Sequence, residues 1–357
     1  MKRLFILIVI SGCFLPVSRA ADNNTFNVNG FFSAGAGILS SDEITLNGYD
    51  EAPDFRQDSI FGIQLARKLN EQFAVTGQLV ARGQDSFDAE VAWAYATYVH
   101  SPETYIRAGR VRLPLFFYSD QQEVGYTYPW IRPPVEVYQF PFSSLEAVDI
   151  SHSMAIDGGS LEMQFYLGSL SEDIEGVAFE IEEVTGIILQ LRHHHLRLRL
   201  GYNQGDVTRP VEGTPLETLV ATNDAFVSED YLIEFYSAAI RYDTGRWFAF
   251  GEWTRINSES ALSPDRDGWL VQGGTYINDA TLHLTYSRLD QRLRSGTTGE
   301  QQKPFLNEEH SVTTGLRYDL DEGIALKLEL QYQEELRVQG LPGENGTLYS
   351  AAVDMVF

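Results

Sequence analysis

Cysteine is almost absent from this 357-residue chain, which contains only Cys13. A chain with one cysteine has no disulfide framework to hold it together. Basic residues are also scarce, because 26 Lys and Arg stand against 50 Asp and Glu, a net charge of −24. That balance excludes a nucleic-acid-binding protein, which needs a basic surface. Aromatic residues at 12% and hydrophobic residues at 43% are nevertheless sufficient for an ordered fold.

Long hydrophobic runs are missing as well. No segment after the first 20 residues reaches the roughly 18 apolar residues that a membrane-spanning helix needs. Residues 1–20 have the pattern of a secretory signal, with Lys2 and Arg3, the run LFILIVI and a small-residue end at Ala20. This leaves residues 21–357 as one domain. The tetrapeptide ending at Cys13, ISGC, also fits a lipidation site, and the sequence leaves that alternative open.

The rest of the chain consists of segments of about ten residues that are apolar at every second position. The total is about 16, an even number, as in transmembrane β-barrels. Short connections near Asn70, Ser101, Gly158, His194, Thr244, Asn278 and Asp321 alternate with long ones near Thr45, Gln84, Pro129, Asp173, Thr214, Ser260, Gly299 and Gly343. This alternation of lengths favours an all-β transmembrane antiparallel barrel over a soluble β-sandwich or propeller, because barrels combine short periplasmic turns with longer external loops.

Two stretches lack a clear period. The first, Pro114–Glu146, mixes aromatics, prolines and acids over about 30 residues, and loops of that length are usually functional. We expect it to fold into the barrel lumen. The second, Asn203–Asp230, is predicted to be a polar loop with a short helix at Pro215–Ala221. Strands are expected to resume at Ala147–Ser153 after the first stretch.

The alternation also assigns the charged residues of the strands to one face. A charge that faces the middle of the bilayer costs about 2–4 kcal/mol, so the charged positions are expected to face water. A barrel of this size is too wide for side chains to fill and is expected to hold water. The inward set predicted on this basis contains Arg110, Arg112, Gln164, Gln190, Arg192, Arg197, Arg199, His283, Arg317, Lys327 and Glu329.

The chain ends in an alternating segment, with Tyr349 and Val353 on one face and Phe357 as the last residue. Such an ending resembles the assembly signal of bacterial outer-membrane proteins. Together with the signal segment, the strand count, RAGRVRLP at 107–114 and YPWIRPP at 128–134, the whole mature chain resembles the trimeric 16-stranded porins of gamma-proteobacteria.

This resemblance implies a protein of the Gram-negative outer membrane that forms a water-filled channel for passive diffusion of small hydrophilic solutes and ions. It also implies a long third external loop folded into the lumen, a homotrimer, and contacts with outer-membrane lipid, lipopolysaccharide and the barrel assembly machinery. Acids on the loop would face bases on the wall and create a transverse field. The predicted constriction residues are Arg110, Arg112, Asp120, Glu123, Arg132, Glu136, Arg197 and Arg199. For Arg132 we favour a role in pinning the loop, and for the loop aromatics we favour packing over sugar stacking.

Other functions remain as alternatives. A channel specific for a sugar, carboxylate or phosphate would share the same architecture. A barrel hydrolase using His152 and Ser153 is disfavoured, because a triad also needs an orienting acid and an oxyanion site. Consecutive strand residues point to opposite faces, so His193–His195 would be a poor metal chelate. We therefore expect no enzyme activity and no cofactor or metal centre, apart from Ca²⁺ or Mg²⁺ held loosely by acidic external loops.

Overall fold

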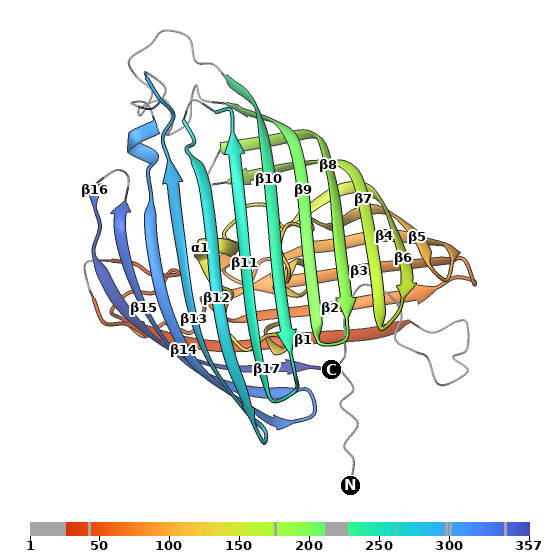
Figure 1. Ribbon diagram of the computed structural model, residues 1–357, viewed down its shortest axis with the longest axis horizontal. Coiled ribbons are helices and arrows are strands. Elements are labelled where there is room, and N and C mark those ends of the chain that lie inside the picture. Colours follow the sequence, from red (N-terminus) through yellow and green to blue (C-terminus); the bar gives the residue numbers. More distant parts are fainter. Residues whose placement is uncertain are drawn as a thin grey trace.

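The strands of this protein close into a barrel (Figure 1). The computed structural model describes residues 26–357 except 42–43, 175–176, 211–227, 261, 297–298, 300–301 and 339–340. In these ranges, sixteen long antiparallel strands pair in chain order, and the first strand pairs with the last, Phe31 opposite Val356. This confirms the predicted fold class. The signal segment, including Cys13, and the helix expected at 215–221 lie outside the described residues.

The long strands are β1 (Asn27–Leu39), β2 (Ile60–Lys68), β3 (Phe73–Arg82), β4 (Ala89–Ser101), β5 (Thr104–Arg112), β6 (Ser144–Ile156), β7 (Gly159–Ile174), β8 (Val177–His193), β9 (Leu196–Pro210), β10 (Ser228–Asp243), β11 (Trp247–Ser258), β12 (Asp265–Ile277), β13 (Ala280–Arg292), β14 (Glu308–Asp321), β15 (Ile324–Val338) and β17 (Asn345–Val356). The two-residue β16 (Leu341–Pro342) pairs with β15. The short helical turns are η1 (Gly83–Asp85), η2 (Ser119–Gln121), η3 (Gly125–Thr127), α1 (Val135–Tyr138) and η4 (Lys303–Phe305). No helix in the described ranges is long and apolar enough to cross a membrane.

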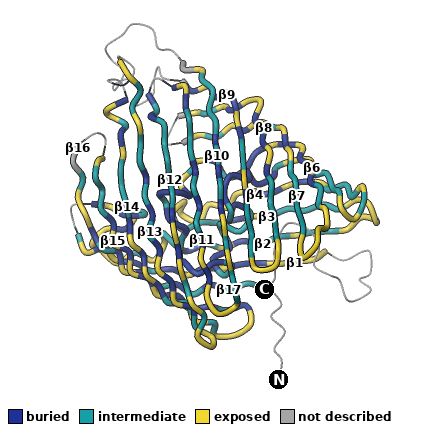
Figure 2. Tube along the Cα trace, in the orientation of Figure 1, coloured by how far each residue is buried: buried dark blue, intermediate teal, exposed yellow. Residues whose placement is uncertain are grey.

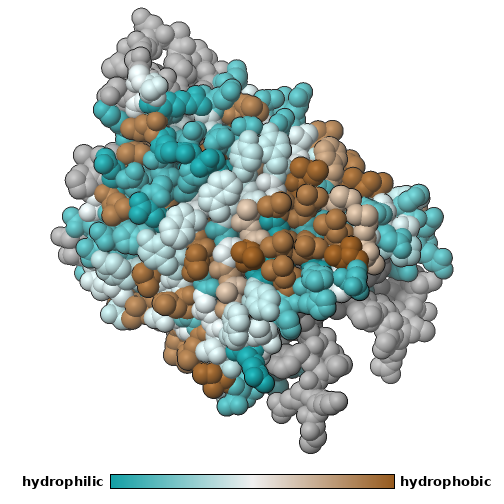
Figure 3. Space-filling view, viewed as in Figure 1, coloured by the Kyte–Doolittle hydropathy of each residue, from teal (hydrophilic) through white to brown (hydrophobic). Residues whose placement is uncertain are grey.

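The two faces of the sheet differ in chemistry because successive strand residues point to opposite sides. Figure 2 shows buried and exposed positions alternating along the strands. In β1, Phe32 and Ile38 are exposed whereas Ser33 and Leu39 are buried. Figure 3 shows apolar side chains gathered across the strands that face the viewer, with hydrophilic ones toward the long-loop ends. The large exposed side chains of the strands include Phe61, Leu65, Leu79, Val148, Ile150, Phe165, Leu167, Ile187, Leu200, Ile240, Val271, Leu282, Leu284 and Leu328.

The predicted alternation of turn lengths holds at the short turns. Five of these turns contain a residue with positive φ, namely Gly158, His194, Gly245, Asn278 and Gly323, as tight hairpins require. The end of the barrel that carries them is called the short-turn mouth below. Three predictions near the opposite mouth are wrong. The strands β7 and β8 continue through the segment around Asp173, and β9 and β10 extend into the expected loop 203–230. The third wrong prediction is the first residue of the strand after the long loop. This strand, β6, begins at Ser144 and not at Ala147.

Candidate functional site

The segment 113–143, called the inner loop below, leaves β5 and lies against the inner wall. The Arg199 guanidinium on β9 donates to the carbonyl of Leu115 at 2.9 Å. On β15, the Lys327 ammonium donates to the carbonyl of Gly125 at 2.7 Å. Since β9 and β15 are far apart in the strand order, these contacts place the inner loop across the interior. Figure 1 shows α1 enclosed by the strands.

Aromatic side chains form the centre of the inner loop. Trp130 is fully buried, and its indole Nε1 donates to Thr285 Oγ1 on β13 at 2.8 Å. Tyr118 lies edge-on to Trp130 and to Phe250 of β11, with ring centroids 5.8 and 5.5 Å apart. These rings are enclosed by one another and by the wall. Their burial supports packing as their role and leaves little ring surface on which a sugar could stack.

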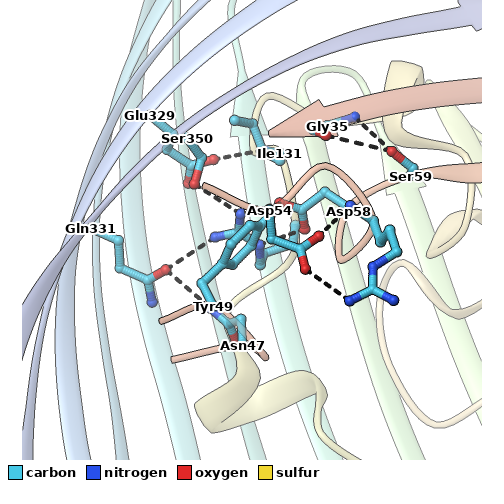
Figure 4. Close-up of polar contacts among 12 residues, drawn as sticks. Gly35, Asn47, Tyr49, Asp54, Asp58, Ser59, Ile131, Glu329, Gln331 and Ser350 are labelled. Carbon is cyan, nitrogen blue, oxygen red and sulfur yellow. Dashed lines mark hydrogen bonds and ion pairs between the residues drawn. The ribbon is translucent and has the colours of Figure 1, made fainter. Parts of the chain in front are cut away.

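Arg132 anchors the inner loop to a second loop, the connection between β1 and β2. Its Nε donates to Asp58 Oδ1 at 2.7 Å, and its Nη2 contacts the other carboxylate oxygen of Asp58. The same guanidinium reaches Gln331 on β15 and Ser350 on β17 at 3.4 and 3.0 Å (Figure 4). It also lies over the ring of the fully buried Tyr49. These contacts support the predicted pinning role.

Glu123 is enclosed by two arginines of the wall. It contacts Arg82 on β3 and lies 3.3 Å from Arg112 on β5. Burial alone would raise the pKa of Glu123, but the charges of Arg112 and Arg82 lower it. Arg112 also donates to the carbonyl of Ser119 at 2.8 Å. Both Glu123 and Arg112 therefore hold the inner loop in place, and the charge of Glu123 is compensated by Arg112 and Arg82.

Glu136 on α1 is fully buried against β12–β14. Among the described residues neither carboxyl oxygen of Glu136 has a partner at hydrogen-bond distance and angle. The hydroxyls of Ser287 and Ser311 are still close enough to favour the ionised form of Glu136. Burial nevertheless raises the pKa of Glu136 above the ordinary carboxyl value. The close contact of α1 with β12 depends on Gly268, where a Cβ would meet the Glu136 carbonyl oxygen at 2.2 Å. Glu136 is thus a buried group and does not line a passage.

The placement of Arg110 in the lumen is wrong. Arg110 lies opposite Glu146 of β6 and forms an ion pair with it at 2.8 Å. Glu146 belongs to the exposed face that continues with Val148 and Ile150. Besides Arg112, a base of β5 that points inward is Arg107, which pairs with the buried Asp149 through contacts of 2.8 and 2.6 Å. Arg110 lies near the end of β5, where an outward charge costs about 0–1 kcal/mol.

Asp120 on η2 differs from the other loop acids. It is only half-buried and forms no hydrogen bond or ion pair among the described residues. Its charge acts on Arg107 of β5, Glu162 of β7 and Arg199 of β9. Asp120 therefore faces the β5–β9 section of the wall, and it is the predicted loop acid that retains a free carboxylate.

The two predicted bases of β9 have different roles. Arg199 is 3% exposed and binds the loop carbonyl of Leu115 together with Ser237, so it is a structural anchor. Arg197 also points inward, but it is half-buried.

The inner wall of β11–β15 is covered by the inner loop, with Glu252, Thr285 and Lys327 nearly inaccessible. On β7–β9 the inward polar residues Glu162, Gln164, Gln190, Arg192 and Arg197 remain partly exposed. The accessible interior therefore lies beside β7–β9.

Several buried contacts of the inner loop were not predicted from the sequence, including those of Glu329, which was predicted to point inward. Glu252 on β11 accepts from the backbone N–H of Phe117 at 2.7 Å and from the Tyr138 hydroxyl. Glu329 on β15 accepts from the N–H of Ile131 at 2.7 Å. Strand alternation identifies Glu252 as an inward residue, but only the folded chain shows that it binds loop backbone. Asp58 gave no signal, since it lies in an irregular segment.

The last strand, β17, closes the barrel against β1. Tyr349 and Val353 lie on its outward face, with Tyr349 51% exposed. The backbone N–H of Phe357 donates to the carbonyl of Gly30 on β1 at 3.0 Å. A Cβ at Gly30 would meet the Phe357 ring at 2.3 Å, so this glycine makes room for the terminal side chain.

Metal-binding groups of three or more His, Cys, Asp or Glu do not occur among the described residues. His193 ends β8 and His194 adopts the positive φ of the following turn. His195 Nδ1 contacts the Asp243 carbonyl oxygen at 2.8 Å. The three imidazoles therefore occupy a turn.

No protein-family model and no curated protein matches this sequence. Solved structures do match over nearly the full length. OmpT, an outer membrane protein of Vibrio cholerae, superposes with a TM-score of 0.64 at 12% identity, covering 94% of this chain and 99% of that one. An anion-selective porin from Comamonas acidovorans gives 0.63 at 14% identity, with 93% and 99% covered. OmpF from Salmonella typhi gives 0.62 at 11% identity, with 94% and 98% covered. At these identities the likeness establishes the fold, and the chain has the sixteen-stranded barrel fold of the outer-membrane porins.

Proposed function

We propose that this protein is an outer-membrane porin through which small hydrophilic solutes and ions diffuse passively. The observation that carries this proposal is the contrast between the two faces of one closed sheet. The outer face carries large apolar side chains, and only a closed barrel lets strands cross lipid without unpaired backbone groups. The inner face carries partly exposed Glu162, Arg192 and Arg197, which need water.

The inner loop sets the width of the proposed passage. It is anchored on β3, β5, β9, β11, β13, β15 and β17 by hydrogen bonds or ion pairs. An obstruction held at so many points is stiff, so the channel would exclude solutes by size. Its free acid, Asp120, faces bases of the opposite wall, and opposed charges in a narrow opening act on polar solutes.

A channel specific for one class of solute is the second candidate. The observation that favours it is the dense aromatic packing of the inner loop around Trp130, which leaves a restricted interior. A specific channel would show block of its ion current by a micromolar solute from a panel of sugars, carboxylates and phosphate. A general porin would conduct without such block.

We also infer that three copies assemble, because one of the similar structures is the trimer form of OmpT. No enzymatic role is proposed. His152 and Ser153 are consecutive residues of β6, so their side chains leave opposite faces of the sheet. His152 contacts the hydroxyl of Thr104 at 2.8 Å.

Planar-bilayer conductance of the refolded protein tests the proposal. Stepwise insertion events with a reproducible unit conductance are expected, and unheated protein should migrate differently on a gel from boiled protein. A heat-modifiable barrel that never conducts would contradict the proposed function while leaving the fold intact.

A further inference from the structure

Three arginines lie side by side on the inner wall. Arg192 on β8 is the register partner of Arg197 on β9, which is in turn the register partner of Arg241 on β10. All three point inward, because they alternate with the buried inward positions Ile188 and Ala239 and with Arg199. Like charges directly opposite one another on neighbouring strands destabilise a sheet. The row therefore works against folding unless something neutralises it.

Among the described residues, Arg241 is the member of this arginine row that has hydrogen-bonding partners. Arg241 donates to Asp243 Oδ2 at 2.8 Å and to the Tyr118 hydroxyl at 3.1 Å. Arg192 and Arg197 are half-buried and form no hydrogen bond or ion pair among the described residues. One acid in this part of the wall, Glu162, is the register partner of Gln190, and its charge interacts with Arg192 without a hydrogen bond or ion pair. Two guanidinium groups thus lack a hydrogen-bond acceptor in the described part of the chain, although the charges of Glu162 and Asp243 act near them.

The row lies on the short-turn side of the inner loop. Arg192 and Arg197 each lie two positions from the turn residues His194 and His195. The next inward residue of β9 in the opposite direction, Arg199, binds the backbone of the inner loop. A solute that passes between the inner loop and β7–β9 must therefore pass Arg192 and Arg197 before it reaches the short-turn mouth.

We propose that Arg192 and Arg197, with Arg241 beside them, form an anion subsite that takes small solutes bearing a carboxylate or phosphate group. A guanidinium offers paired N–H donors that match both groups. The subsite would make the passage prefer anions although the whole chain is strongly acidic. This inference rests on the proposed channel function.

The experiment measures the reversal potential in a planar bilayer under a KCl gradient, and then the block of the current by inorganic phosphate. Wild type is expected to prefer chloride. In the double variant Arg192→Gln/Arg197→Gln, the anion-over-cation permeability ratio should fall by about threefold or more, because two positive charges leave the passage. Arg246→Gln is the matched control, since Arg246 is an exposed base in the turn after β10, and it should leave both quantities unchanged.

A second variant separates a binding site from a general field. Arg192→Lys/Arg197→Lys keeps both charges but removes the paired donors, so it should keep the chloride preference and lose block by phosphate. A conducting wild type whose selectivity and phosphate block survive in both double variants overturns the subsite alone. A wild type that inserts and never conducts overturns the channel function instead. A heat-modifiable gel shift confirms that each variant has folded.

Discussion

The Arg132 guanidinium of the inner loop binds the Asp58 carboxylate of the β1–β2 connection through two nitrogens, with Nε 2.7 Å from Oδ1. Both side chains are nearly inaccessible, at 13% and 8% exposure. The pair joins two long connections inside one barrel, and Ser350 and Gln331 tie it to the wall. Loss of this pair would therefore loosen the inner loop and the β1–β2 connection together.

Asp58→Ala should destabilise the docked loop. Removing one partner of a buried ion pair leaves the other charge uncompensated and costs about 3–5 kcal/mol. We expect a lower temperature for the gel-mobility transition and noisier single-channel current. The control Arg56→Ala breaks an exposed pair with Asp54, which should cost about 0–1 kcal/mol. Equal behaviour of the two variants would contradict the anchoring role of Asp58.

Trp130→Ala should widen the passage as well as loosen the loop. Trp130 is fully buried, and replacing a buried Trp by Ala costs about 3–5 kcal/mol because a cavity remains. Unit conductance is expected to rise. Trp130→Phe keeps most of the packing and loses the bond to Thr285, so it should lie between wild type and Trp130→Ala. Unchanged conductance in Trp130→Ala would show that the loop does not limit the flow.

Asp120→Asn should alter selectivity without altering stability. The carboxylate is half-buried and unpaired in the described part of the chain, so its removal breaks no structural contact. Loss of this negative charge should shift the reversal potential toward anions, while the gel-mobility transition stays where it was. Glu71→Gln in an exposed short turn is the control and should change neither. A shift of equal size in the control would assign the effect to surface charge.

Glu136 should make loop docking sensitive to pH. Its pKa in the folded chain is raised by burial, so the folded state favours the protonated carboxyl. The docked loop is then most stable below the ordinary carboxyl pKa of about 4.3 and loses stability as pH rises through the higher folded pKa. Open-channel noise should accordingly increase with pH over that interval.

The variant Glu136→Gln cannot ionise, so it should abolish this pH dependence and keep the loop quiet at neutral pH. Glu322→Gln, in an exposed short turn, should retain the wild-type profile. If Glu136→Gln also retains that profile, another group controls the loop.

Gly30→Ala should weaken the seam between β1 and β17. The added Cβ would lie 2.3 Å from the Phe357 ring, and overpacking of this kind costs about 1–3 kcal/mol. Refolding yield and gel-transition temperature should both fall. Gly273→Ala is the control, because nothing lies within 4 Å of a Cβ at that position. A Gly30→Ala protein that refolds like the control would mean that the Phe357 ring moves aside freely.

The barrel itself was predictable because its determinants are local. The strand period of two appears in every segment, and turn residues such as Gly158 and Asn278 mark the hairpins. The inward direction of Arg197, Arg199 and Lys327 followed from the same alternation.

Side-chain partners across the barrel were not predictable, because they depend on where distant segments meet. Alternation placed Arg110 and Arg112 on one face, but Arg110 pairs with the outward Glu146 whereas Arg112, the last residue of β5, contacts the inner loop, so parity alone did not place both. Glu136 reads as a lumen acid in sequence, yet α1 buries it against β12–β14. Asp58 and Tyr49 show no period at all, and only folding of the β1–β2 connection brings them to Arg132. The local sequence pattern thus determined the strands that form the barrel wall. Three-dimensional packing determined which of the charged side chains are buried in ion pairs and which remain accessible inside the barrel.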